Sequence, residues 1–306
     1  MRSVMNERWN IILAFAAVYV VWGSTYLAIQ IGLNDLPPFM LSGLRFLIAG
    51  LVLQCWCSWK GESLPDRKSI WRSSLAGVLM LVGGVVSVAW AEQFMSSSLA
   101  AIIVTLLPFW FIILDKKQWS FYFSNKSIIA GLVLGFAGVC ILFGFGNLSL
   151  SANHSNQVEG ILVIFCGGIA WTAGSLYAKY KPVKASLLVN GSIQLLAAGV
   201  FCLLISWAIG EWNHFSLSAT NASSWMALLY LIVMGSLVAY LSYLYLLKKR
   251  PAAQVNTYVY INPVIAILLG AVLANESITL IKIIGLTIIL VGVLLVNIPK
   301  YRLHST

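Results

Sequence analysis

Long apolar stretches recur along the whole chain, separated by short polar connections. Ten of them approach or exceed the roughly 20 residues that a helix needs to cross a bilayer. They are continuous instead of alternating with a period of two, which favours spanning helices over barrel strands. The sequence therefore predicts an all-α polytopic membrane protein with ten transmembrane helices. The candidate spans are residues 9–32, 38–58, 73–93, 97–114, 127–144, 159–179, 185–207, 225–247, 252–273 and 281–298.

The second half of the chain repeats features of the first half. Trp22 and Arg45 have counterparts in Trp171 and Gln194, 149 residues later in each case. Each half holds five candidate spans, an odd number, so the second copy must enter the membrane in the opposite orientation. Inverted repeats are characteristic of secondary transporters. The predicted organisation is a first five-helix repeat at 9–144, an external linker at 145–158 and an inverted second repeat at 159–298.

Composition supports a membrane protein and gives no sign of an enzyme. Of the 306 residues, 60% are hydrophobic and only 9% are charged, with a mean hydropathy of +0.90, whereas soluble domains are about a quarter charged. The sequence contains no catalytic motif, phosphate-binding loop or metal-ligand cluster, and its five cysteines lie within predicted spans. We expect a non-enzymatic protein without metal or cofactor, driven by a proton gradient, another gradient or a partner.

The basic residues orient the predicted spans. If the N-terminus is cytoplasmic, the inward-facing loops and tails hold 17 of the 19 lysines and arginines, all except Arg45 and Lys282. This is the positive-inside distribution, which places both termini in the cytoplasm. The net charge of +10 is thus dispersed along the cytoplasmic face, where anionic lipid is the expected partner and nucleic acid is not.

Polar and aromatic residues form stripes inside the first and sixth spans. Tyr19, Trp22 and Tyr26 share one helix face in the first span, and Trp171 and Ser175 share a face in the sixth. A single such stripe also fits helix packing or an interfacial aromatic belt. Matching stripes in both halves favour a shared cavity, because hydroxyl groups have no reason to face lipid at mid-depth.

Three further spans carry stripes of the same kind. The third span places Ser87 and Trp90 on one face, and the eighth and ninth spans add four more residues. We expect all of these side chains to contribute to a substrate cavity. The four residues are Tyr240, Tyr243, Asn256 and Tyr260.

Two prolines interrupt corresponding spans. Pro108 and Pro263 are 155 residues apart, in the fourth and ninth spans. A proline in a helix removes one backbone donor and frees a carbonyl about one turn earlier. Interrupted segments at equivalent places in two repeats point to a binding site, so we interpret the pair as gate or kink positions.

Arg45 and Glu92 are the charged side chains expected within or at the edge of the hydrocarbon zone. Arg45 is near the start of its helix and Glu92 near the end of its own, where the helix dipole disfavours their respective signs. The two could pair at the external mouth. Arg45 could instead bind substrate or extend to the outer surface.

Several short motifs resemble those of the drug/metabolite transporter superfamily, in particular its ten-helix EamA-type permeases of bacterial inner membranes. The resemblance implies a basket-like bundle whose first, third, fourth, sixth, eighth and ninth spans line a central cavity. Small four-helix members of the superfamily use a buried acid in the first span, which is absent here. The motifs are Trp22-Gly23-Ser24-Thr25-Tyr26, Pro37-Pro38, Arg45-Phe46, Ala91-Glu92 and Tyr258-x-Tyr260-Ile261-Asn262-Pro263.

The residues and the resemblance together predict a secondary transporter in a bacterial inner membrane. Alternating access by the two repeats would export a small metabolite. An aromatic cavity with hydroxyls, amides and an arginine suits an amino acid or a related amphipathic compound. The alternative is a multidrug or toxic-compound efflux permease, which would use the same aromatic rings for cation–π contacts.

The loop charges generate a topological prediction. Single cysteines at positions 153 or 218 should react with a membrane-impermeant thiol reagent added from outside. Cysteines at positions 118 or 182 should react only after the membrane is permeabilised, because the positive-inside rule places them in the cytoplasm. The reverse labelling pattern would refute the orientation.

Overall fold

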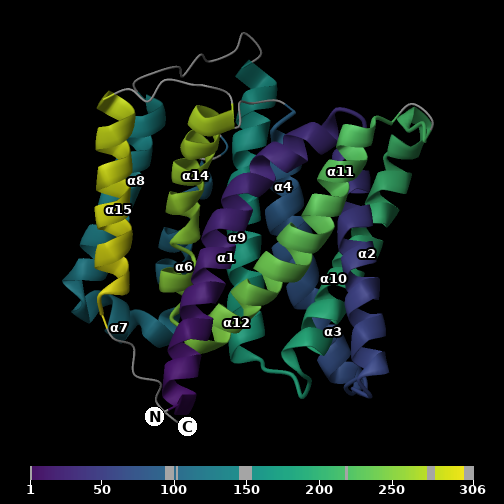
Figure 1. Ribbon diagram of the computed structural model, residues 1–306, viewed down its shortest axis with the longest axis horizontal. Helices are drawn as coiled ribbons and strands as arrows, with labels where there is room; N and C mark the ends of the chain where they lie inside the picture. Colours follow the sequence, from purple (N-terminus) through teal and green to yellow (C-terminus); the bar gives the residue numbers. More distant parts are fainter. Residues whose placement is uncertain are drawn as a thin grey trace.

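The computed structural model describes residues 2–93, 100, 103–144, 154–217, 220–273 and 280–299, and every regular element in these ranges is helical. Labels follow Figure 1. The elements are α1 (Arg2–Leu33), α2 (Pro38–Trp59), α3 (Arg67–Gly77), η1 (Val78–Val86), α4 (Ser87–Ala91), α6 (Leu107–Leu114), η2 (Lys116–Gln118), α7 (Trp119–Ser124), α8 (Lys126–Gly144), α9 (His154–Tyr180), α10 (Leu187–Ala208), η3 (Glu211–His214), α11 (Ala222–Tyr230), η4 (Leu231–Tyr240), α12 (Leu241–Lys249), α13 (Ala252–Val255), α14 (Tyr258–Leu273) and α15 (Leu280–Asn297).

Six helices in the described residues are long and apolar enough to cross a membrane. They correspond to the first, second, third, sixth, seventh and eighth expected spans. A seventh is obtained if the segments 116–124 and 126–141, bent by 92°, count as one span. The all-helical, polytopic class is therefore confirmed, and the number ten stays a prediction. Residues 145–153 of the expected linker, and position 218 of the labelling experiment, lie outside the described residues.

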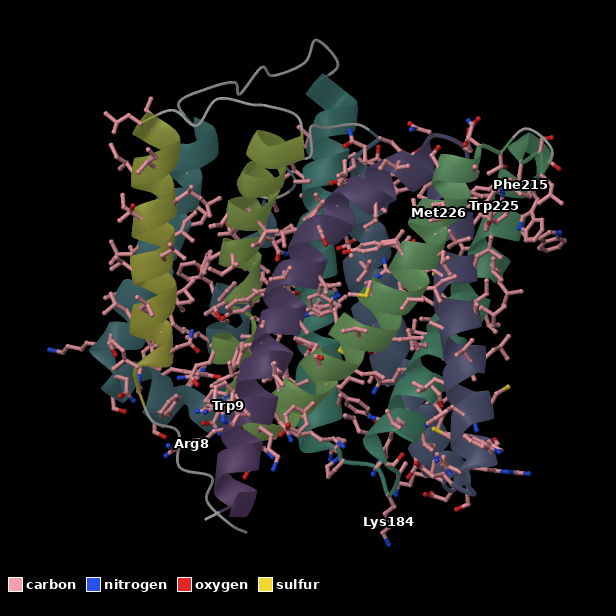
Figure 2. All side chains as sticks on the ribbon, viewed as in Figure 1. Arg8, Trp9, Lys184, Phe215, Trp225 and Met226 are labelled. Carbon is pink, nitrogen blue, oxygen red and sulfur yellow. The ribbon has the colours of Figure 1, made fainter. Side chains whose placement is uncertain are left out.

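The helices stand side by side in one bundle (Figure 1). Helix α1 begins, and α15 ends, at the same end of the bundle, which we call the terminal end; the other end is the opposite end. Helix α9 runs from the opposite end to the terminal end and is therefore antiparallel to α1. Arg8 and Lys184 lie toward the terminal end, whereas Trp225 and Met226 lie near the opposite end (Figure 2).

Glycines allow the closest helix contacts. A Cβ atom on Gly199 of α10 would lie 2.5 Å from the backbone nitrogen of Leu47 in α2. A Cβ on Gly292 of α15 would lie 2.6 Å from the carbonyl oxygen of Gly131 in α8. Small residues bring backbones together in this way because membrane helices associate through close packing. The pairs α2–α10 and α8–α15 are held by these contacts.

The contacts of α1 and α9 correspond to one another. Helix α1 packs against α14 and η4, whereas α9 packs against α6 and η1. In the expected order of spans, the first touches the ninth and eighth, and the sixth touches the fourth and third. The first span corresponds to the sixth, the ninth to the fourth and the eighth to the third, so the contacts of α1 and those of α9 are equivalent.

Two wide helical segments occupy matching places in the third and eighth spans. Both η1 and η4 are π-helical, and their first residues, Val78 and Leu231, are 153 positions apart. π-helical turns are rare and are often associated with function. Each segment includes a pair of small residues, Gly83-Gly84 in η1 and Gly235-Ser236 in η4.

Two carboxylates join the two halves of the chain at the opposite end. Asp35 accepts hydrogen bonds from the backbone nitrogen of Asn221 at 3.0 Å and from Ser224 Oγ at 2.6 Å, at the start of α11. These bonds, the Ser224 hydroxyl first, lower the pKa of Asp35. Glu211 in turn accepts from the backbone nitrogens of Phe39 and Met40 in the first turn of α2, at 3.2 and 2.8 Å. Each helix N-terminus thus obtains the acceptor that its free N–H groups need.

The glycine contact predicts a position-specific effect on stability. Gly199→Leu should lower the free energy of unfolding by about 1–3 kcal/mol, a typical cost of overpacking, because its side chain would overlap the α2 backbone. Val200→Leu is the matched control, since Val200 is 49% exposed. The measurement is thermal unfolding of purified protein in detergent. Equal midpoints for the two variants would contradict the close approach.

Candidate functional site

A central cavity lies between the helices, with about 950 Å³ of empty space, a figure that includes space open to solvent. Its wall combines residues of α1, α2, η1, α6, α9, η4 and α14, and it also receives Val88 of α4. Both π-helical segments contribute to the wall, through Gly84 in η1 and through Gly235 and Ser236 in η4. The first, third, fourth, sixth, eighth and ninth expected spans therefore all reach this cavity.

Four of the expected cavity residues line the wall. Trp22 and Tyr26 come from α1, Trp171 comes from α9 and Tyr240 ends η4. The wall also contains Trp110 of α6, whose ring packs edge-to-face on Phe165 at 4.8 Å between centroids. The stripe pattern did not single out Trp110, because it has no hydroxyl-bearing or amide neighbours on its helix face.

An aromatic cluster forms the floor of the cavity on the side of the terminal end. The Trp22 ring lies 5.6 Å from Trp171, 5.3 Å from Tyr243 and 4.6 Å from Tyr258, measured between centroids. Trp171 and Tyr243 are 5.1 Å apart. Aromatic pairs at such distances and tilts attract one another beyond the area they bury. Four rings from α1, α9, α12 and α14 thus pack together on this side of the cavity.

Hydrogen bonds hold this floor in place. Trp22 Nε1 donates to the carbonyl oxygen of Gly235 at 3.3 Å, and Trp171 Nε1 donates to Asn256 Oδ1 at 3.3 Å. The Tyr243 hydroxyl is bonded to Ser175 Oγ at 2.7 Å. Ser175, Tyr243 and Asn256, expected in the cavity, therefore lie in a layer on the terminal side of its wall.

The remaining expected cavity residues lie elsewhere. Tyr19 is bonded to Thr257 Oγ1 at 2.7 Å, one helical turn nearer the terminal end than the floor. Ser87 donates to the Gly84 carbonyl oxygen of its own helix at 2.7 Å, and Trp90 packs in a small apolar cluster. Tyr260 faces α8, where its hydroxyl donates to the Leu132 carbonyl oxygen at 3.3 Å. None of these four side chains is on the cavity wall.

Arg45 reaches the cavity from α2. Its side chain is only 5% exposed, and its Nε donates to Ser236 Oγ at 2.9 Å. The guanidinium carbon also lies 5.0 Å from the centroid of the Phe46 ring. Glu92 lies in the turn after α4. The structure gives Arg45 a hydroxyl partner, and its pairing with Glu92 stays a prediction.

The two prolines occupy different positions in their helices. Pro108 is in the first turn of α6, after a turn at Thr105 and Leu106, so the fourth expected span is interrupted just before it. Pro263 lies inside α14, and the turn in that span is at Asn256 and Thr257. Both spans are interrupted, but at different distances from the proline. The role of either proline as a gate or kink stays a prediction.

A buried carboxylate near the terminal end was missed by the sequence pattern. Asp115 Oδ2 accepts from the Tyr122 hydroxyl at 2.9 Å, and its Oδ1 accepts from the Tyr180 hydroxyl at 2.5 Å. Tyr122 also accepts from the Ala253 backbone nitrogen at 3.4 Å. Burial raises the pKa of Asp115, although both tyrosine hydroxyls oppose that shift. This carboxylate joins α7 to α9 and, through Tyr122, to α13.

A lysine makes a second cross-link on the same side. Lys179 Nζ donates to the carbonyl oxygens of Leu247 at 3.0 Å and Arg250 at 2.5 Å, where α12 ends. A cation at a helix C-terminus satisfies free carbonyl groups and is favoured by the helix dipole. The contacts of Asp115 and Lys179 both include α9, so this helix is tied to its neighbours at the terminal end.

Comparison with known proteins identifies the relatives of this chain. The profile of the EamA-like transporter family matches twice, at residues 8–144 and 158–298. An uncharacterized inner membrane transporter, YedA, from Escherichia coli K12 is 34% identical over 290 residues, which cover 94% of this chain and 90% of YedA. A second relative, an uncharacterized transporter from Archaeoglobus fulgidus, is 27% identical, and the alignment covers 97% of this chain and 100% of that protein. A solved crystal structure shares the fold, with a TM-score of 0.75 and 19% sequence identity. The match covers 94% of this chain and 97% of the chain in that structure.

The Asp115 cross-link predicts a loss of stability on its removal. Asp115→Ala leaves the buried Tyr122 hydroxyl without this acceptor and removes the bond to the partly buried Tyr180; a buried hydroxyl without a partner costs about 1–3 kcal/mol. Thermal unfolding in detergent should therefore occur at a lower temperature than for the wild type. Glu159→Ala removes the same charge from an exposed position and should leave the midpoint unchanged. A stable Asp115→Ala variant would show that the carboxylate does not hold these helices together.

Proposed function

The chain belongs to the EamA-like transporter family, and from that premise we propose that it exports small metabolites, most of all amino acids or related amphipathic compounds, by alternating access. Its relatives include a protein described as an inner membrane transporter. The observation that carries the substrate class is the buried Arg45 guanidinium on the wall of an aromatic cavity.

Arg45 suits the carboxylate of a substrate. In the described part of the chain its hydrogen-bond partner is the Ser236 hydroxyl, which is neutral. Burying a cation without a charged partner is costly, and a guanidinium pairs with a carboxylate through two parallel hydrogen bonds. A carboxylate in the cavity would supply the missing negative charge, while Ser236 orients the guanidinium toward it.

Asn262 suits the amino group of the same substrate. It lines the cavity and is 4% exposed, and its Oδ1 is buried without a hydrogen-bond partner among the described residues. An unpaired buried acceptor is unfavourable, and an ammonium group has three donors. Arg45 and Asn262 thus offer a donor and an acceptor for the two ends of a zwitterion. The rings of Trp22 and Trp171 offer an apolar surface for its side chain.

Alternating access is supported by the correspondence between the two halves. The family profile matches each half separately, the matching π-helical segments both line the cavity, and the contacts of α1 correspond to those of α9. Two copies in opposite orientation provide two equivalent gates around one site. We propose that the aromatic floor, Asp115 and Lys179 form one of these gates, at the terminal end.

The direction of transport follows from the expected topology. With both termini in the cytoplasm, as the loop charges predict, the proposed gate would face the cytoplasm. A cavity closed on that side and open to the outside would correspond to the release step of an exporter. A gradient, such as that of protons, or a partner would drive the return to the inward-facing state.

Multidrug efflux is a second candidate, and the apolar character of the cavity favours it. Trp22, Trp110 and Trp171 line the wall together with several aliphatic residues. Such a surface accepts varied apolar cations through cation–π contacts. The two candidates differ in their need for Arg45, because a cationic drug would be repelled by the guanidinium.

We therefore predict that Arg45 determines preference for a carboxylate. In vesicles with the purified protein, wild type should transport an amino acid in preference to the corresponding amide, which lacks the charge. Arg45→Gln should raise the KM for the amino acid by roughly tenfold to 100-fold, the equivalent of losing a charged hydrogen bond. Arg45→Gln should also abolish the preference for the amino acid over the amide. The measurement is uptake of a panel of radiolabelled amino acids, with and without a pH gradient.

Arg8→Gln is the matched control, because Arg8 is exposed at the terminal end of α1. Its KM should equal that of wild type. Transport of cationic dyes by wild type, with no amino-acid flux and no effect of Arg45→Gln, would favour the multidrug alternative. Absence of flux for every compound class would contradict transport itself.

A further inference from the structure

A second, smaller cavity lies near the terminal end, apart from the central one. It has about 300 Å³ of empty space, a figure that includes space open to solvent, and is bounded by α3, α9, α10, α12 and the segment 181–183. Three cationic side chains, Arg72, Lys181 and Lys248, belong to its lining, and no aspartate or glutamate is among the described residues of that lining. The described lining of this cavity therefore carries a net positive charge.

The inner wall of this cavity is polar. Ser73 Oγ donates to Asn190 Oδ1 at 2.7 Å, and one helical turn further along α10 lies Gln194. Gln194 is fully buried, and its Oε1 accepts a hydrogen bond from the Tyr240 hydroxyl. Its Nε2 is buried with no partner among the described residues. A buried donor in this condition costs about 1–3 kcal/mol, and an acceptor in the cavity would remove that cost.

We propose that this cavity is an anion-binding site for a carboxylate or phosphate group. Arg72 matches the geometry of such groups through paired hydrogen bonds, whereas Lys181 and Lys248 contribute point charges at the rim. The Gln194 amide supplies a donor at the inner end. The site goes beyond the proposed transport activity and is separate from the Arg45 site, because Tyr240 and Gln194 stand between the two cavities.

Two sources can present this group at the expected cytoplasmic face. Anionic lipids are enriched in that leaflet, and basic pockets between membrane helices bind their headgroups. Soluble anions reach the same face from the cytoplasm. Both sources offer oxygen acceptors of negative charge, so the same residues would bind either one. Since Lys181 and Lys248 are exposed, salt would weaken the attraction.

The position of Gln194 adds a second argument. It lies 149 residues after Arg45, the offset that also relates Trp22 to Trp171. Each of the two side chains is buried, bonded to a hydroxyl of η4 and part of a cavity wall. Gln194, in the wall of the smaller cavity, therefore occupies the position in α10 that corresponds to Arg45 in α2.

The test compares two double variants with equal loss of charge. Arg72→Gln with Lys248→Gln removes two cations from the cavity. Arg8→Gln with Lys184→Gln removes two exposed cations outside it at the same end (Figure 2). The probes are phosphatidylglycerol, whose retention by the purified protein is measured by native mass spectrometry, and inorganic phosphate, titrated against the unfolding temperature in detergent. Wild type should bind at least one probe.

The cavity variant should bind that probe roughly 30-fold more weakly, because it loses two basic residues at about 1 kcal/mol each near a membrane surface. The control variant should bind it as wild type does. Selective weakening with the lipid identifies a headgroup, and selective weakening with phosphate identifies a soluble anion. The proposal is overturned if wild type binds neither probe, or if both double variants have the same affinity. Neither result depends on transport, so failure here leaves the Arg45 prediction intact.

Discussion

The need to satisfy every polar group in a medium without water governs this structure. Backbone N–H and C=O groups in hydrocarbon have no solvent partner, so the spans are helical. The same constraint applies to side chains, which explains why Trp171 Nε1 is bonded to Asn256 and the Tyr243 hydroxyl to Ser175. Groups left without a partner in the described residues then stand out. Asn262 Oδ1 and Gln194 Nε2 are two of them, and each belongs to a cavity wall.

The helical class and the central aromatic residues could be predicted from the sequence because both depend on simple periodicities. Apolar length identified the six clear spans. The offset of 149 residues paired Trp22 with Trp171, whose rings are in contact in the folded chain. A repeat places equivalent residues near a common axis, and side chains from two inward-facing helices meet there. Arg45 was likewise found from its charge within an apolar run.

The positions of other residues could not be predicted from the periodicity of the sequence. The prediction of stripes assumed 3.6 residues per turn, but η1 and η4 are π-helical and rotate less per residue, so helix faces beyond them are displaced. Ser87, which follows η1, bonds to the Gly84 carbonyl oxygen of its own helix and is not on the cavity wall. Asp115 falls between the fourth and fifth expected spans, where the apolar pattern gives no reason to expect burial. Its burial is due to Tyr122 and Tyr180, which come from two other helices, and only the tertiary structure brings them together.

The cap on α2 has a consequence for biosynthesis. The first N–H groups of this helix bond to Glu211, which lies 172 residues after Phe39 in the chain. The ribosome therefore adds the whole of α10 before α2 acquires its acceptor. The hydrogen bonds of Asp35 likewise form only after Asn221 and Ser224 have been synthesised. The first half thus enters the membrane with an unfinished helix end, and its final packing is a late event that requires the second half.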